Sequence, residues 1–146
     1  MEQIKFSCCI SNSDPTAALG IEIHWNDQTI YQNSHVVEPV TFEFEIADSE
    51  QEAANCFKFI LSGKLPQHTK INSQGQIISD AVLSLSDIKF DGIEIDHVVH
   101  LNSVYHHNFN GNSDWSDQGF FGILGCNGTV TFKYYTPLYL WLLPII

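Results

Sequence analysis

Apolar and polar residues alternate with a period of two along much of this chain, and this pattern restricts it to a sheet fold. Successive side chains of a strand point to opposite faces, so such alternation predicts strands with one buried face. The clearest segments are residues 4–10, 21–25, 42–46 and 57–61. Charged residues at the intervening positions favour antiparallel sheets, because parallel strands are usually apolar on both faces.

Two dipeptides, Asp91-Gly92 and Asn127-Gly128, predict tight hairpins. Both accept the positive φ angles that a two-residue type I′ turn requires. The cross-strand pairs that these turns predict are Lys89 with Glu94, Phe90 with Ile93, Phe121 with Tyr134 and Ile123 with Phe132.

The apolar phase changes within the strand that precedes the first of these turns. Apolar positions are odd-numbered up to Leu85 and even-numbered from Ile88. One extra residue near position 86 reconciles them, which predicts a β-bulge opposite Asp96, in a returning strand that continues to Leu101. The only helical segment expected is residues 48–55, with one or two turns.

Eight or more short strands separated by turns favour two packed sheets. Long connections rich in turn-forming residues are expected at residues 12–18, 64–76 and 106–118. We therefore expect an all-β fold, an antiparallel, jelly-roll-like β-sandwich, with residues 1–146 forming a single domain.

The charge of the chain excludes several classes of partner. Six basic residues, all lysine, stand against 17 acidic ones, and the formal net charge is -11. Nucleic-acid binding needs cations at the phosphates, and anionic membrane surfaces repel an acidic protein, so we expect neither partner. The acidity either serves solubility or attracts a basic partner or a divalent cation.

The N-terminal residues lack the basic start and apolar run of a secretion signal, which predicts an intracellular product. The apolar run at residues 139–146 is too short to cross a membrane. The cysteines Cys8, Cys9, Cys56 and Cys126 are expected to be unpaired, because two are adjacent and the chain is not of the small secreted type.

The loop at residues 106–117 concentrates side-chain oxygen atoms. Carboxylate and amide oxygens suit calcium, so we name a calcium site there, although the spacing differs from the twelve-residue calcium loop. Its ligands are predicted to be Asn110, Asn112, Asp114 and Asp117. The alternative is a polar surface loop stabilised by Asx turns.

The sequence contains no recognisable catalytic motif, and we do not expect an enzyme. Adjacent histidines such as His106 and His107 point to opposite faces of a strand, which argues against a zinc site. Glu43 and Glu45 could form the carboxylate pair of a hydrolase, but their alternation with Phe places them on a solvent face.

Aromatic residues beside the polar loop are candidates for ligand binding. Tyr105 precedes this loop, and Trp115 and His107 lie within it. Exposed aromatic rings stack on sugars and anchor protein partners. Trp25 and Trp141 are instead in phase with apolar runs and are expected in the core.

The C-terminal segment is strongly apolar and must be buried by something. Pro144 cannot donate in a central strand, so we expect a strand or turn through Trp141 and then an irregular tail. The predicted interface residues are Pro144, Ile145 and Ile146.

Two resemblances bear on function. Residues 120–128, with Phe132 and residues 135–143, resemble the C-terminal part of small structural proteins of tailed bacteriophages. With residues 61–95 included, the chain also resembles the sandwich of carbohydrate-binding modules, which often bind calcium and sugar through loops.

The first resemblance implies a virion structural or accessory protein, such as a capsid decoration, neck or tail component. Such a protein is made in the host cytoplasm, resides in the virion and contacts other virion proteins and copies of itself. The second resemblance implies a lectin-like carbohydrate-binding module, with or without a requirement for calcium, that binds a glycan through Trp115, Tyr105 and the polar loop.

Overall fold

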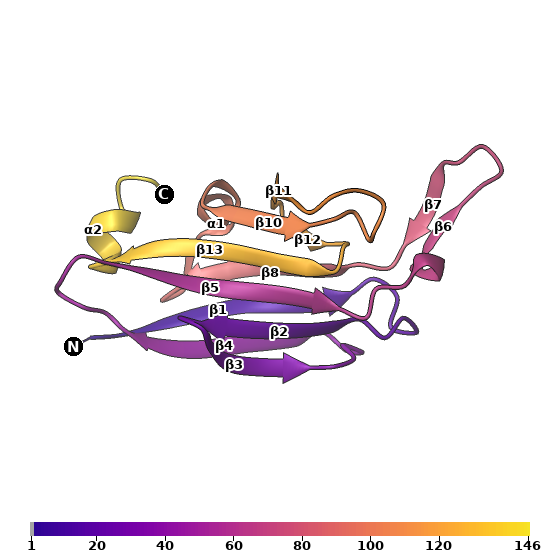
Figure 1. Cartoon of the computed structure of the whole chain (residues 1–146). Helices are drawn as coiled ribbons and strands as arrows, with labels where there is room; N and C mark the ends of the chain where they lie inside the picture. The colour runs from indigo at the N-terminus through magenta and orange to yellow at the C-terminus, as the bar shows by residue number, and fades with distance from the viewer. Residues whose placement is uncertain (1) are drawn as a thin grey trace.

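The computed structural model describes residues 2–146, and its long strands form two facing antiparallel sheets (Figure 1). The first sheet has the order β12-β8-β1-β4, made of β1 (Gln3–Asn12), β4 (Val40–Ala47), β8 (Leu83–Phe90) and β12 (Ile123–Leu124), with β9 (Ile93–Glu94) paired to β8. The second has the order β11-β10-β13-β5-β2-β3, made of β2 (Gly20–Trp25), β3 (Gln28–Asn33), β5 (Ala53–Ser62), β10 (Ser103–His107), β11 (Ser116–Gly119) and β13 (Gly128–Thr136).

The chain passes repeatedly from one sheet to the other. It crosses between β1 and β2, between β3 and β4, between β4 and β5, and again between β12 and β13. Several strands that are neighbours in a sheet, such as β1 and β8, are therefore distant in sequence. This arrangement confirms the expected antiparallel, jelly-roll-like sandwich.

Alternate residues of the strands fill the space between the sheets, as the period-two pattern predicts. Phe6 of β1 is fully buried and stacks on Phe57 of β5, with 4.1 Å between ring centroids. Phe90 of β8 meets Phe6 edge-on at 5.5 Å. Each fully buried ring stabilises the fold by roughly 1.5 to 3 kcal/mol, so this aromatic cluster is a main source of cohesion between the sheets.

The Asp91-Gly92 hairpin is confirmed, with Lys89 paired to Glu94 and Phe90 to Ile93. The predicted bulge is also present in β8, at Asp87, whose φ is 49°. Its partner differs from the expected one, because the shift in register lies against Ser7 and Cys9 of β1.

The expected returning strand to Leu101 is wrong, because the chain forms the helix α1 (Asp96–Leu101). The adjacent residues Val98 and Val99 are both fully buried, which a strand with one buried face does not allow. The Asp96 carboxylate accepts a hydrogen bond from the Ile88 amide at 2.7 Å and so joins the start of α1 to β8.

The predicted Asn127-Gly128 hairpin is wrong, because β12 pairs with β8 in the first sheet and β13 with β5 and β10 in the second. The Asn127 side chain instead bonds both backbone groups of Lys64, at 3.0 and 2.9 Å. Gly128 allows a close approach to β10, since a Cβ there would lie 2.3 Å from the His106 carbonyl oxygen. Asn127 and Gly128 therefore stabilise the point where the chain passes from the first sheet to the second, and not a hairpin turn.

Two further local predictions are corrected. Residues 48–55 contain no helix: β5 begins at Ala53, and Asp48 accepts a hydrogen bond from the Leu138 amide at 3.0 Å. The C-terminal segment forms a helix, α2 (Leu138–Leu142), and not a strand. Its residues Leu138 and Leu142 are fully buried because a spacing of four puts both on one helix face.

No helix within residues 2–146 has the length and apolar character to span a membrane.

One hairpin stands apart from the sandwich. It consists of β6 (Thr69–Ile71) and β7 (Ile77–Asp80) and follows the short 3-10 helix η1 (Pro66–His68). Figure 1 shows it projecting beyond the end of the sheets opposite to α2. We call this hairpin the arm.

Candidate functional site

The edge of the second sheet beside β10 carries an exposed aromatic ring, Trp115, in the polar loop. Burial alternates along β10: Ser103, Tyr105 and His107 face the interior, and Val104 and His106 face outward. β11 pairs with β10 so that Asp117 lies directly opposite His106. Partners directly across a ladder share a face, so both side chains lie on the outer surface.

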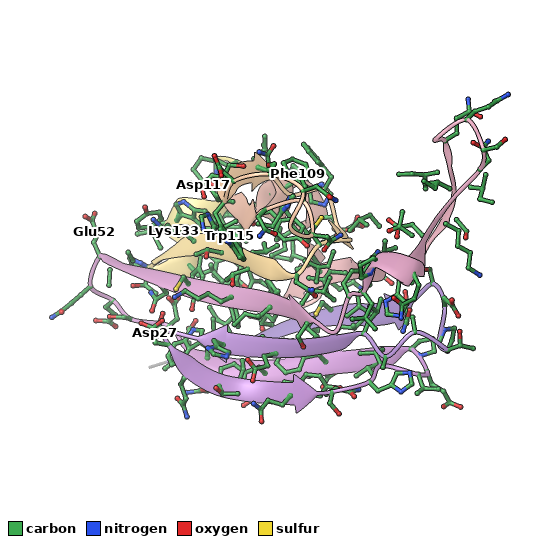
Figure 2. All side chains as sticks on the ribbon, turned by 45° about the vertical axis from the view of Figure 1, so that its right-hand side comes forward. Asp27, Glu52, Phe109, Trp115, Asp117 and Lys133 are labelled. Carbon is green, nitrogen blue, oxygen red and sulfur yellow. The ribbon has the colours of Figure 1, made fainter. Side chains whose placement is uncertain are left out.

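Trp115 completes this arrangement from the residue before β11. Its ring stacks on the His106 imidazole, with 5.3 Å between centroids and 22° between planes. The His106 Nδ1 atom lies 2.8 Å from the Asp117 Oδ1 atom. Trp115 nevertheless remains 56% exposed. We call Trp115, His106 and Asp117 the aromatic platform; Figure 2 labels Trp115 and Asp117.

A row of cross-strand partners, polar except for Ile60, extends from the aromatic platform across the outer face of the second sheet. The cross-strand register continues from His106 to Thr129, then to Ile60, Glu22 and Gln32. The Gln32 amide donates to the Glu22 carboxylate at 2.5 Å. The hydroxyl of Thr129, the carboxylate of Glu22 and the amide of Gln32 therefore lie in the row that begins at His106, the residue on which the Trp115 ring stacks.

The polar loop is stabilised by its own hydrogen bonds. The Asn108 side chain accepts from the Gly111 amide at 2.9 Å, and the Asn112 side chain donates to the Phe109 carbonyl at 3.0 Å. The Asn110 side chain bonds the backbone of residues 125 and 127, both at 3.1 Å. These contacts are those of a surface loop with Asx turns.

The predicted calcium ligands fit a metal site only in part. The amide groups of Asn110 and Asn112 bond to protein, and the Asp117 carboxylate contacts His106. In the described part of the chain, no group of three or more His, Cys, Asp or Glu side chains is placed to hold a metal. The set with Asp114 therefore stays a prediction, and we assign no role that depends on calcium.

Tyr105, expected as an exposed aromatic, is buried at 4% exposure. Its hydroxyl donates to the Cys126 carbonyl and accepts from the Cys126 amide. Burial raises the pKa of Tyr105 well above its usual range. This side chain joins the loop after β12 to β10 and is not accessible to a ligand.

His107 is also turned inward and is 5% exposed. Its Nδ1 atom accepts a hydrogen bond from the Phe109 amide at 3.0 Å, and the Phe109 ring packs against it edge-on. Burial and the neighbouring His106 lower the pKa of His107. His107 thus stabilises the start of the polar loop. The adjacent His106, which was not predicted as a site residue, stacks on the Trp115 ring.

A groove of about 490 Å³ lies between the arm and the polar loop. Its walls are mainly apolar and its polar groups are few; the lining residues are Leu65, Pro66, Thr69, Ile71, Ile77, Asp80, Phe109, Asn110, Asn112, Gly125 and Cys126. We call it the arm groove. The turn-forming residues at 64–76 predict only a connection here, although isoleucines flank the central turn of the arm.

A buried ion pair fixes the base of the arm. The Lys64 side chain is almost wholly buried, and its Nζ atom lies 2.5 Å from the Asp80 carboxylate. The Thr69 hydroxyl donates to the same carboxylate at 2.7 Å.

Burial raises the pKa of the Cys126 thiol, so this thiol is not an activated nucleophile.

The structure leaves the predicted interface residues Pro144, Ile145 and Ile146 at the surface. Trp141, expected in the core, is partly buried and packs against it. The side chain of Leu140 is 76% exposed on the same short helix. The proposed contact of the tail with a partner stays a prediction.

Comparisons with known proteins gave a distant structural likeness. No family model and no curated protein matches the sequence. A solved structure described as vCBM60 in complex with galactobiose is 12% identical, with a TM-score of 0.48, over 88% of this chain and 96% of that one.

A second structure is the selenomethionine form of vCBM60, from work on circular permutation between two families of calcium-dependent carbohydrate-binding modules. It has the same identity, TM-score and coverage of this chain, and 89% of its own chain is covered. Neither is described as a virion protein, so the expected virion role gains no support. Likeness at this level does not decide function.

Proposed function

We propose that this protein is a non-catalytic glycan-binding domain whose sugar ligand lies on the aromatic platform. The observation that carries the proposal is the exposed Trp115 ring, stacked on His106 beside the Asp117 carboxylate. A large aromatic ring held in place at the surface is typical of a recognition site.

The chemistry of the aromatic platform suits a sugar ring. A pyranose has an apolar face of C–H groups, which packs on an aromatic face, and hydroxyl groups at its rim, which need hydrogen-bond partners. Trp115 supplies the first. Asp117 and Thr129, which lie on either side of His106 across β10, supply the second. Because Trp115 already rests on His106, little of its side-chain freedom remains to be lost on binding.

The charge near the platform limits the class of glycan. Asp114 and Asp117 flank Trp115 in the sequence, and the whole chain carries a formal charge of -11. Uronic acids, sialic acids and sulfated sugars would meet a carboxylate without a nearby arginine to balance them. Neutral glycans are therefore the expected ligands.

A glycan array probed with the intact protein tests this proposal. We expect retention on neutral oligosaccharides and none on their anionic counterparts at physiological salt. Galactobiose belongs on the array as a neutral disaccharide, and parallel runs with calcium and with a chelator test the predicted calcium set. Absence of retention on every neutral glycan, in both conditions, would contradict the proposal.

A further inference from the structure

We propose that the arm and the arm groove form a self-association surface, in which two copies of this chain insert their arms reciprocally into each other's groove. This surface is separate from the aromatic platform and does not depend on the glycan-binding proposal. The arm projects beyond the end of the sandwich (Figure 1), and the open arm groove lies between it and the polar loop.

The arm exposes large apolar side chains that no other residue in the described range 2–146 covers. Ile71 and Ile77 are cross-strand partners and so share the face that lines the arm groove. They are nonetheless 60% and 66% exposed, and Ile78, which lies at the register shift beside Ile77, is 65% exposed. An isolated two-stranded hairpin is only marginally stable in water, so a partner that packs on these side chains would order it.

The distribution of charge identifies the partner as a second copy. Residues 71–79 carry no charge, although the whole chain carries -11. The only charged side chain that lines the arm groove is Asp80, and Lys64 neutralises it. A basic partner would find no unbalanced counter-charge there, whereas a second arm brings the uncharged, apolar side chains of Ile71 and Ile77. The exposed Lys70 of β6 pairs with Ser79 and does not line the groove.

Reciprocal insertion also gives a closed two-fold contact. The isoleucine face of each arm meets the wall formed by Leu65 and Phe109 in the other copy, where these two side chains are 48% and 44% exposed. The same patch then serves on both partners, as two-fold dimers require. The arms keep the two acidic sandwiches apart, because they extend beyond the ends of the sheets.

Sedimentation equilibrium of the full chain, from micromolar to near-millimolar concentration, tests this inference. We expect a transition from one to two copies that strengthens as salt is raised, because salt screens the repulsion between acidic bodies. Ile77→Ser should raise the dissociation constant about tenfold or more, as expected for a central apolar contact. Leu101→Ser is the matched control, because Leu101 is 79% exposed on α1, outside the arm and its groove.

Several outcomes would overturn the inference. A chain that stays monomeric at every concentration and salt tested would contradict it, and so would Ile77→Ser associating as tightly as the unaltered protein. The inference would also be rejected if Ile77→Ser lost glycan retention while its sedimentation mass stayed that of the unaltered protein, because the groove would then bind a sugar. Melting curves of both variants check the fold, and the mass of the unaltered protein tests the inference even if a variant fails to fold.

Discussion

Replacing Trp115 with alanine is expected to weaken glycan binding about thirtyfold, or roughly 2 kcal/mol, the loss typical of a central aromatic contact. The ring is 56% exposed and lies outside the core cluster, so the melting temperature should change little. Isothermal titration with a neutral oligosaccharide that the array retains measures the effect directly.

Two further variants distinguish the contribution of the Trp115 ring to affinity from that of His106, on which the ring stacks. Trp115→Phe keeps an aromatic face of smaller area and should retain part of the affinity. His106→Ala keeps the indole but removes the imidazole on which it stacks, so we expect a smaller loss from a less ordered ring. Unchanged affinity in Trp115→Ala, with the fold intact, would place the sugar elsewhere.

Removing residues 137–146 is expected to unfold the isolated protein. Leu138 and Leu142 are fully buried, and each large aliphatic side chain lost from a core costs about 2 to 5 kcal/mol. The sum of two such losses approaches the whole stability of a typical domain, about 5 to 15 kcal/mol. Circular dichroism with urea titration measures the result.

A shorter deletion of residues 144–146 provides the control for that experiment. These residues are exposed, and the helix α2 ends before them at Leu142. The short truncation should therefore keep its cooperative transition while losing any contact that the tail makes with a partner. A folded protein without residues 137–146 would show that α2 is dispensable for the sandwich.

Sequence reasoning predicted the sandwich because its evidence was local and periodic. Each strand with apolar residues at every second position, such as the one through Phe6, was placed with the correct face inward. The Asp91-Gly92 turn was also correct, because both of its strands are adjacent in sequence. These features depend on the order of nearby residues and not on distant contacts.

The errors arose where a distant contact determined the local structure. Asn127 appears suited to a hairpin, but its side chain bonds Lys64, more than sixty residues earlier in the chain. Val98 and Val99 are both buried by packing that no local period reveals, so a predicted strand became α1. Turn and strand propensities are weak compared with such tertiary constraints.

The candidate site was predicted in region but not in every residue. The sequence around the loop predicts three ligand-binding residues. Trp115 is exposed, whereas Tyr105 and His107 are buried. Alternation along β10 explains the difference, since residues 105 and 107 share one face and His106 takes the other. The phase of β10 was not predicted, because residues 103–107 mix polar and aromatic residues at successive positions.

The most direct test of the glycan-binding proposal is to observe the tryptophan indole signals during a titration with a neutral oligosaccharide. The chain has three tryptophans, Trp25, Trp115 and Trp141, which give three indole N–H resonances in a nitrogen-correlated NMR spectrum. Trp25 donates its indole N–H to the Tyr134 hydroxyl at 2.8 Å and serves as an internal reference. We predict that the Trp115 signal shifts in proportion to the sugar bound while those of Trp25 and Trp141 stay in place. A shift of another indole with Trp115 unmoved, or no shift with any neutral glycan, would contradict this account.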